Sequence, residues 1–151
     1  MEIDGLEIGA TLTPVPTPVG TILPDAPPRI ECPRDSAWFH IPDNGQYLFQ
    51  PITAQGTANI PNFANYRFEI KPANDSNAQF GIMGGDNSTA VTDGPLGLID
   101  INGLAYGEYR LRLAVFDIER VLRASCEITI HIGPPPRPST QQAVASATPE
   151  S

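Results

Sequence analysis

The stretch Leu104-Ala105-Tyr106-Gly107-Glu108-Tyr109, followed by the alternating run Arg110-Leu111-Arg112-Leu113-Ala114-Val115-Phe116-Asp117, decides the fold. Leu104, Gly107 and Tyr109 have the spacing of a tyrosine corner, in which a tyrosine hydroxyl ties the start of a strand back to the preceding loop. Such corners are typical of Greek-key β-sandwiches. The stretch therefore predicts a strand of a sandwich. It indicates no activity, because folds of this kind carry many unrelated functions.

Period-2 alternation and turn residues recur along the chain and predict about seven strands in an essentially all-β domain. The predicted strands are residues 37–41, 49–58, 65–71, 79–83, 97–101, 108–117 and 123–132. Along the third strand, alternation places Tyr66, Phe68 and Ile70 inward and Arg67, Glu69 and Lys71 outward. The run Gly84-Gly85-Asp86-Asn87 is expected to form a turn after the fourth strand.

Proline divides the chain into a folded unit and two extended ends. Of the 17 prolines, six lie in residues 1–28 and five in residues 134–151. We therefore expect a Pro/Thr-rich linker over 1–28, a sandwich over 29–133, and a Pro/Ser/Thr/Ala-rich tail over 134–151. The acidic start Met1-Glu2-Ile3-Asp4-Gly5 does not resemble a secretory signal. Either the protein is cytosolic, or this chain is an excerpt from which a signal or anchor has been removed, and we favour the excerpt.

Charge and hydropathy narrow the range of partners. The formal net charge of −8 disfavours nucleic acid and anionic membranes, which select basic patches. The nine basic residues are spread along the sequence without clustering. No run of 18 apolar residues exists, so no direct membrane insertion is expected.

The two cysteines bracket the predicted sandwich. Cys32 stands at its entrance and Cys126 in its last strand, where the first and last strands of a sandwich can run side by side. The pair is therefore a candidate disulfide, which would persist only in an oxidising compartment. The alternative is two buried free thiols, because cysteine packs well as a small hydrophobe.

Several motifs together resemble bacterial Ig-like or fibronectin type III-like modules. They are Gly56-Thr57-Ala58, Phe63-x-x-Tyr66-x-Phe68-Glu69, Gly94-x-Leu96-Gly97 and the tyrosine-corner stretch up to Asp117. The resemblance covers about residues 30–133 and implies a domain of exported cell-surface proteins. Two departures are Leu98, where members often have tryptophan, and Ile118-Glu119-Arg120, where they often have Asn-Gly.

Residues with catalytic or ligand-binding potential form no complete constellation in the sequence. His40 and His131 lack further ligands at metal spacing, and no Gly-x-Ser-x-Gly elbow occurs, so we expect no metal, cofactor or enzyme activity. Asp43, Asp75 and Asp86 lie among asparagines, which suggests calcium ligands but fits turn residues better. Trp38 fits either a core or edge packing position or an exposed carbohydrate- or protein-binding platform.

The sequence favours a non-catalytic extracytoplasmic module that acts as scaffold, spacer or protein-interaction domain of a bacterial cell-surface protein. Its expected partners are other protein subunits or domains, including copies of itself, rather than small molecules. One alternative is a structural subunit of a surface filament or membrane-anchored assembly that uses its extended tails for contacts. A second is an accessory module, binding carbohydrate or calcium, of an exported enzyme.

Overall fold

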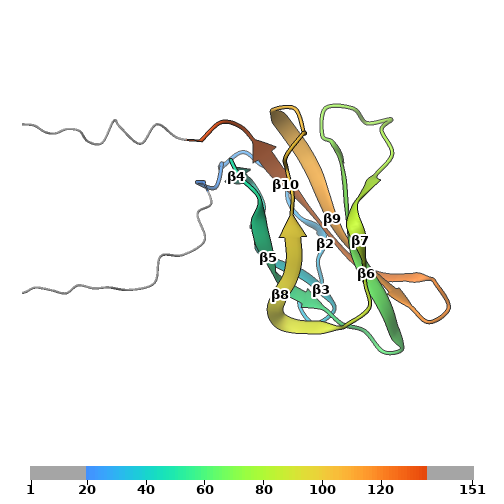
Figure 1. Ribbon diagram of the computed structural model, residues 1–151. Coiled ribbons are helices and arrows are strands. Elements are labelled where there is room, and N and C mark those ends of the chain that lie inside the picture. The colour runs from blue at the N-terminus through green and yellow to red at the C-terminus, as the bar shows by residue number, and fades with distance from the viewer. Residues whose placement is uncertain (1–19, 136–151) are drawn as a thin grey trace, which may run out of the picture.

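Two β-sheets face each other across one apolar core in the computed structural model, which describes residues 20–135 (Figure 1). The six-stranded large sheet contains β2 (Ile30–Glu31), β4 (Gln46–Leu48), β6 (Phe63–Pro72), β7 (Gly81–Asn87), β9 (Gly107–Asp117) and β10 (Leu122–Ile132). The three-stranded small sheet contains β3 (Ala37–Ile41), β5 (Ile52–Ala58) and β8 (Val91–Ile99). The prediction of an all-β sandwich of two sheets is confirmed.

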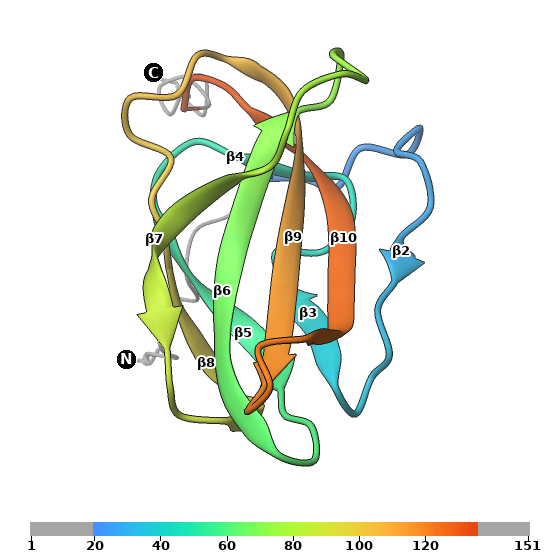
Figure 2. The ribbon, with the colours of Figure 1, turned by 90° about the vertical axis from the view of Figure 1, so that its right-hand side faces the viewer.

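The strand order leaves β7 at one edge of the large sheet and β8 at one edge of the small sheet. The large sheet runs β2-β10-β9-β6-β7, as seen face-on in Figure 2, and the small sheet runs β3-β5-β8. All neighbouring strands are antiparallel except β4, which pairs in parallel with the end of β10. Both β2 and β4 therefore lie along β10, at successive positions.

Alternation decides which side chains enter the core. The β10 side chains predicted to face inward, Cys126, Ile128, Ile130 and Ile132, are all buried, while Thr129 on the opposite face is also buried, beneath Arg110. The rings of Phe39 and Phe68 join the two sheets, with centroids 6.0 Å apart. Tyr66 makes a polar link across the same core, because its hydroxyl donates a hydrogen bond to the carbonyl of Leu96 on β8. Burial raises the pKa of Tyr66.

The turn predicted at residues 84–87 is wrong, because β7 continues through these residues to Asn87. Asn87 still pairs with Tyr66 of β6, across a register shift. Gly84, with a φ of +76°, bends this edge strand without ending it. The chain crosses to the small sheet only after Asn87.

Other strand boundaries also differ from the prediction, and proline and glycine explain most of the differences. Strand β8 begins at Val91, six residues before the predicted start, because Gly94 and Pro95 hide its alternation. Strand β5 begins at Ile52, just after Pro51, and not at residue 49. The short strands β2 and β4 were not predicted, since two or three residues carry no periodic signal.

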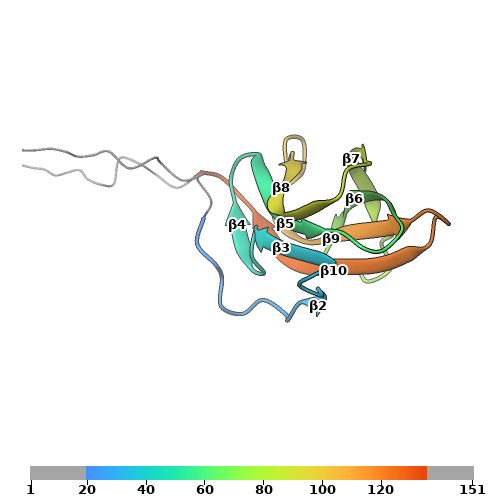
Figure 3. The same ribbon diagram turned by 90° about the horizontal axis from the view of Figure 1, so that it is seen from below.

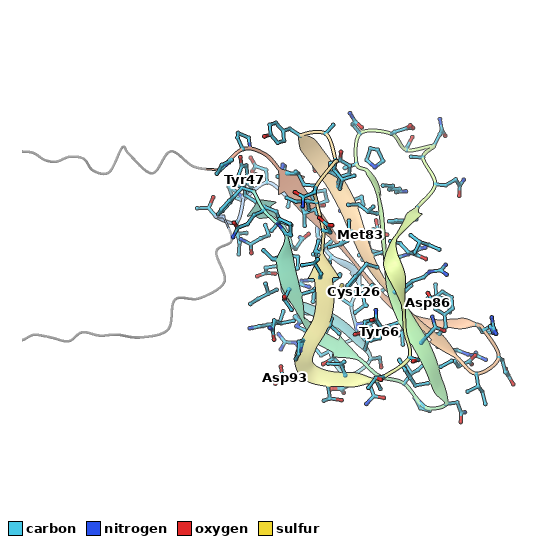
Figure 4. All side chains as sticks on the ribbon, in the orientation of Figure 1. Tyr47, Tyr66, Met83, Asp86, Asp93 and Cys126 are labelled. Atoms are coloured by element: carbon cyan, nitrogen blue, oxygen red, sulfur yellow. A yellow bond between two sulfur atoms is a disulfide. The ribbon has the colours of Figure 1, made fainter. Side chains whose placement is uncertain are left out.

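Both described ends of the chain lie at the same end of the sandwich (Figure 1), where Tyr47 contacts each of them (Figure 4). The Gly20 amide donates to the Tyr47 carbonyl at 2.7 Å, and the Tyr47 hydroxyl donates to the Pro134 carbonyl at 2.8 Å. From Gly20 the chain runs along the outside of the sandwich to β2 (Figure 3). The remainder of the predicted terminal linkers, residues 1–19 and 136–151, lies outside the described residues.

Candidate interaction surface

The outer face of the large sheet, turned away from the core, gathers four of the nine basic residues. Arg67 and Lys71 alternate along β6, while Arg110 and Arg112 alternate along β9. The antiparallel register sets Lys71 opposite Arg110, and Glu69 opposite Arg112. Alternation in two neighbouring strands thus brings cations that are far apart in sequence to one face. Basic residues that are spread along the sequence therefore lie together in the folded sheet.

Glu69 lies at the centre of this face and is only 3% exposed. Its Oε2 accepts a hydrogen bond from Arg67 Nε at 2.7 Å, and its Oε1 accepts one from Arg112 Nε at 2.6 Å. Glu69 points outward as alternation predicts, but the two long arginine side chains cover it. Such charge-assisted pairs are among the stronger hydrogen bonds in proteins. One carboxylate therefore fixes the position of two guanidinium groups.

Two phenylalanine rings extend this row of charges. The Arg112 Cζ lies 4.1 Å from the ring centroid of Phe80, and the Lys71 Nζ lies 4.8 Å from the same centroid. At the other end, the Arg67 Cζ lies 4.8 Å from the ring centroid of Phe116. These are cation–π distances. We call this row the cation–aromatic face, and its members are Arg67, Glu69, Lys71, Phe80, Arg112 and Phe116.

The composition of the cation–aromatic face suits protein binding. Arginine and aromatic residues are enriched at the centres of protein interfaces, where they supply most of the binding energy. The face is bordered by Ile82 of β7, which is 57% exposed and pairs with Glu69 in the sheet register. Its positive groups can bind carboxylates, while its rings and Ile82 offer apolar contact.

Arg110, next to this face, is almost completely buried. Its Nε donates to Glu127 Oε2 at 2.8 Å, and its Nη1 donates to the Thr129 hydroxyl. Its Nη2 is the only buried side-chain nitrogen or oxygen without a hydrogen-bond partner among residues 20–135. Because the protein itself encloses this atom, it lowers stability and does not define a binding site.

The two cysteines identified in the sequence lie together in the structure. Cys32 follows β2 and Cys126 belongs to β10, and a disulfide joins them across 94 residues of sequence. Both are buried, at 7% and 0% exposed. The bond closes nearly the whole sandwich into one loop, beside the backbone hydrogen bond from the Cys32 amide to the Ser125 carbonyl.

The residues of the candidate tyrosine corner meet at the start of β9. The Tyr109 hydroxyl donates a hydrogen bond of 2.7 Å to the Ala105 carbonyl in the preceding loop. Leu104 packs against the core, and Gly107 takes a φ of +149° where the strand begins. These contacts hold the loop before β9 and contribute no reactive group.

Trp38 is half-buried at the edge of the small sheet, against the core. The Arg29 and Arg34 guanidinium carbons lie 4.1 Å and 4.4 Å from the tryptophan ring centroid. A hollow of about 500 Å³ on this side also includes His40 and Asp93. Because the arginines already stack on the ring, a carbohydrate would have to displace them to use Trp38 as a platform.

The acidic residues considered as calcium ligands make local contacts. Asp43 pairs with Arg29, and its Oδ1 accepts the Asn44 amide at 2.7 Å. Asp75 Oδ1 accepts the Asn77 amide at 3.0 Å, as in an Asx turn. Asp86 is exposed on β7. Within residues 20–135, no three His, Cys, Asp or Glu side chains, including His40 and His131, are grouped so as to hold a metal ion.

Comparisons of this chain with family models, curated proteins and solved structures returned no match. Over the described part of the chain, none of the structure is a helix of the length and apolarity needed to cross a membrane.

The cation–aromatic face was not predicted from the sequence, because its charged residues come from two strands about 40 residues apart. Alternating Arg67-Phe68-Glu69 and Arg110-Leu111-Arg112 were the signal for it.

Proposed function

We propose that this chain is a non-catalytic, extracytoplasmic module that binds a protein partner through the cation–aromatic face. The observation that carries the proposal is the row of two arginines held by Glu69 between Phe80 and Phe116. Residues of these types dominate binding hot spots, and here their side chains are fixed before any partner arrives. Preorganised side chains lose little entropy on binding, which favours an interaction role.

The strand order supports assignment of the sandwich to the Ig-like, fibronectin type III-like class. In that class two antiparallel sheets pack face to face with Greek-key connections, and the last two strands of the chain are neighbours in one of them. Here β3-β5-β8 packs on a sheet with β6, β9 and β10 side by side, and β4 runs parallel to β10. The Cys32–Cys126 bond supports export, since disulfides persist in oxidising compartments.

The positions of the two described ends favour a displayed head over an in-line spacer. A spacer carries its neighbours at opposite ends, whereas Gly20 and Pro134 are both bound to Tyr47 at one end of the sandwich. The opposite end of the sandwich, where Figure 4 labels Asp93, is then the end farther from both described chain ends. The cation–aromatic face is therefore presented along the side of a projecting domain.

The charge balance favours an acidic protein segment as the partner. The face holds three cations and one anion, a local charge of +2 on a chain of net charge −8. Charge complementarity of this kind speeds association and selects partners. Nucleic acid is disfavoured, since the rest of the molecule would repel it.

Photo-cross-linking in the cells that produce the protein tests this proposal. A benzophenone amino acid is placed at Ile82, beside the cation–aromatic face, or at Leu98, on the outer side of the small sheet. These positions are 57% and 56% exposed, so they differ in location and hardly in accessibility. We expect a discrete protein adduct from position 82 and none from position 98.

A charge reversal at Lys71 makes the test specific. Lys71→Glu should abolish the adduct at position 82 and leave the melting temperature almost unchanged, because the one contact of Lys71 within the cation–aromatic face is its position over the Phe80 ring. The captured protein should contain an acidic segment at the cross-linked site. Equal adducts from positions 82 and 98, or an adduct that survives Lys71→Glu, would reject the cation–aromatic face as the binding site.

A further inference from the structure

The sequence contains two Asn-Gly pairs, Asn44-Gly45 and Asn102-Gly103. An asparagine followed by glycine can deamidate without an enzyme, because the glycine amide nitrogen attacks the carbonyl carbon of the asparagine side chain. Glycine favours this attack, since it has no side chain to hinder the approach. The local structure around each pair therefore decides whether the reaction proceeds in the folded protein.

The first pair, Asn44-Gly45, is fixed by three hydrogen bonds. The Asn44 side chain donates to the Pro27 carbonyl at 2.6 Å and accepts from the Thr129 amide at 2.8 Å. The Gly45 amide, which would be the nucleophile, donates to the Thr129 carbonyl at 2.7 Å. Gly45 is also enclosed, because an added β carbon would lie 2.7 Å from the carbonyl oxygen of Leu23. Both reacting groups are therefore occupied, which disfavours the attack.

The second pair, Asn102-Gly103, lies in an exposed turn before β9. The Leu104 amide closes this turn on the Ile101 carbonyl at 3.1 Å. The Asn102 backbone amide donates to Asp100 Oδ1 at 3.1 Å. Neither the Asn102 side chain nor the Gly103 amide has a hydrogen-bond partner in the described part of the chain. An added β carbon on Gly103 would meet no atom within 4 Å, so both reacting groups stand in open space.

We propose that Asn102 is a site of spontaneous deamidation in the folded protein, whereas Asn44 is protected. The Gly103 nitrogen forms a bond to Asn102 Cγ, and the side-chain nitrogen leaves as ammonia with the proton that the Gly103 nitrogen gives up. A water molecule then opens the resulting succinimide ring at one of its two carbonyl carbons. The product is aspartate or isoaspartate, and its new carboxyl group releases a proton at neutral pH. The reaction involves no oxidation or reduction.

The product changes the loop that leads to the tyrosine corner. Either form adds a negative charge two residues from Asp100, whose carboxylate repels it. Isoaspartate also lengthens the main chain by one carbon within the turn closed by Ile101 and Leu104, which alters the geometry of the closing hydrogen bond. The carbonyl of Ala105, which accepts from the Tyr109 hydroxyl, follows directly. The modification therefore acts on the loop before β9 and is independent of the partner proposed for the cation–aromatic face.

Peptide mapping of the folded protein and of the protein unfolded in guanidinium chloride tests this proposal. Trypsin cuts after Arg67, so Asn44 and Asn102 fall in different peptides. Deamidation raises the mass of a peptide by one unit, and fragmentation locates the change. In mildly alkaline buffer, folded protein should convert Asn102 at least about tenfold faster than Asn44, because Asn44 reacts only after its hydrogen bonds open. In the unfolded protein the two rates should agree within about threefold.

The control variant is Asn102→Gln, because glutamine would have to close a larger ring. A purified isoaspartyl methyltransferase should transfer labelled methyl groups from S-adenosylmethionine to residue 102 of aged unmodified protein, and to none at that position in aged Asn102→Gln. Equal conversion of Asn44 and Asn102 in the folded protein, or conversion of neither, would overturn the proposal. A gain in mass at Asn102 without methyl transfer would overturn the succinimide route.

Discussion

Strand β6 turns Tyr66 and Phe68 toward the core and Glu69 toward the outside, yet all three are 3% exposed. On the inner face, hydrocarbon packing excludes water, and the one hydroxyl is satisfied by a backbone carbonyl. On the outer face, two arginine side chains surround one carboxylate. Burial on the inner face therefore follows from shape, while burial on the outer face depends on charge pairing. Only the outer face keeps cations that a partner can reach.

Loss of the Phe68 ring should have the largest effect. Phe68 stacks against Phe39 and is 3% exposed, so removal of its ring leaves a cavity between the two sheets. We expect Phe68→Ala to reduce the free energy of unfolding by about 3–5 kcal/mol in urea titrations. The outward control Phe80→Ala should cost about 1 kcal/mol or less. Comparable losses in the two variants would contradict a difference between the faces.

Removal of the Glu69 charge should have the next largest effect. Glu69→Gln leaves two guanidinium groups facing each other without their carboxylate, and we expect a loss of about 2–4 kcal/mol. The arginine side chains are more than a quarter exposed, which keeps this loss below that of a fully enclosed pair. Added salt should reduce the difference in unfolding free energy between Glu69→Gln and the unmodified protein, because salt screens the repulsion between Arg67 and Arg112.

The control for Glu69 is its outward neighbour on the same strand. Lys71→Gln should change stability by about 0.5 kcal/mol or less, since Lys71 holds no ion pair within residues 20–135. If Glu69→Gln proved as mild as Lys71→Gln, the pairs on the outer face would be ordinary surface ion pairs. The proposed preorganisation of Arg67 and Arg112 would then fail as well.

The hydroxyl of Tyr66 should contribute less to the free energy of unfolding than the Phe68 ring or the Glu69 charge. Tyr66→Phe leaves the buried Leu96 carbonyl without its donor, with an expected cost of about 1–3 kcal/mol near pH 7. Burial raises the pKa of Tyr66 above its ordinary value of 10.0, so the unfolded chain loses this proton before the folded one does. The hydroxyl's contribution is thus complete below pH 10 and declines as the pH rises further.

Alkaline unfolding separates this contribution from simple loss of packing. Urea titrations between about pH 8 and 11 give the free energy of unfolding of the unmodified protein and of Tyr66→Phe. The difference between the two free energies should be constant up to about pH 10 and become smaller above it. Phe68→Leu, which changes core volume without any titrating group, should show no such change. A gap that widens above pH 10 would show that the Tyr66 proton is not held in the folded state.

The apolar–polar alternation within each strand predicted which of its side chains point inward and which point outward. The inward set of β10 and the inward residues Tyr66 and Phe68 follow from period 2 alone, and so does the outward direction of Glu69. The burial of Glu69 could not be predicted, because its partner Arg112 is 43 residues away and the register of β6 with β9 decides which outward residues meet. The edge strands β7 and β8 were the least predictable, because Gly84, Gly94 and Pro95 interrupt their apolar–polar alternation. An edge strand pairs with a neighbour on one side only, so it tolerates such interruptions.

The smallest expected effect belongs to the feature that indicated the fold. Tyr109 lies at the end of the inner face, and its hydroxyl donates to the Ala105 carbonyl at an exposed position. Water can replace that donor in Tyr109→Phe, so the cost should be about 0.5–1.5 kcal/mol, at or below that of Tyr66→Phe. Amide exchange should accelerate in residues 101–107 and stay unchanged at Glu69, because the corner holds only the loop before β9. Faster amide exchange across the whole large sheet would instead show that the corner stabilises the entire sandwich. A loss of unfolding free energy larger than that of Tyr66→Phe would show that the exposed hydroxyl contributes more than the buried one.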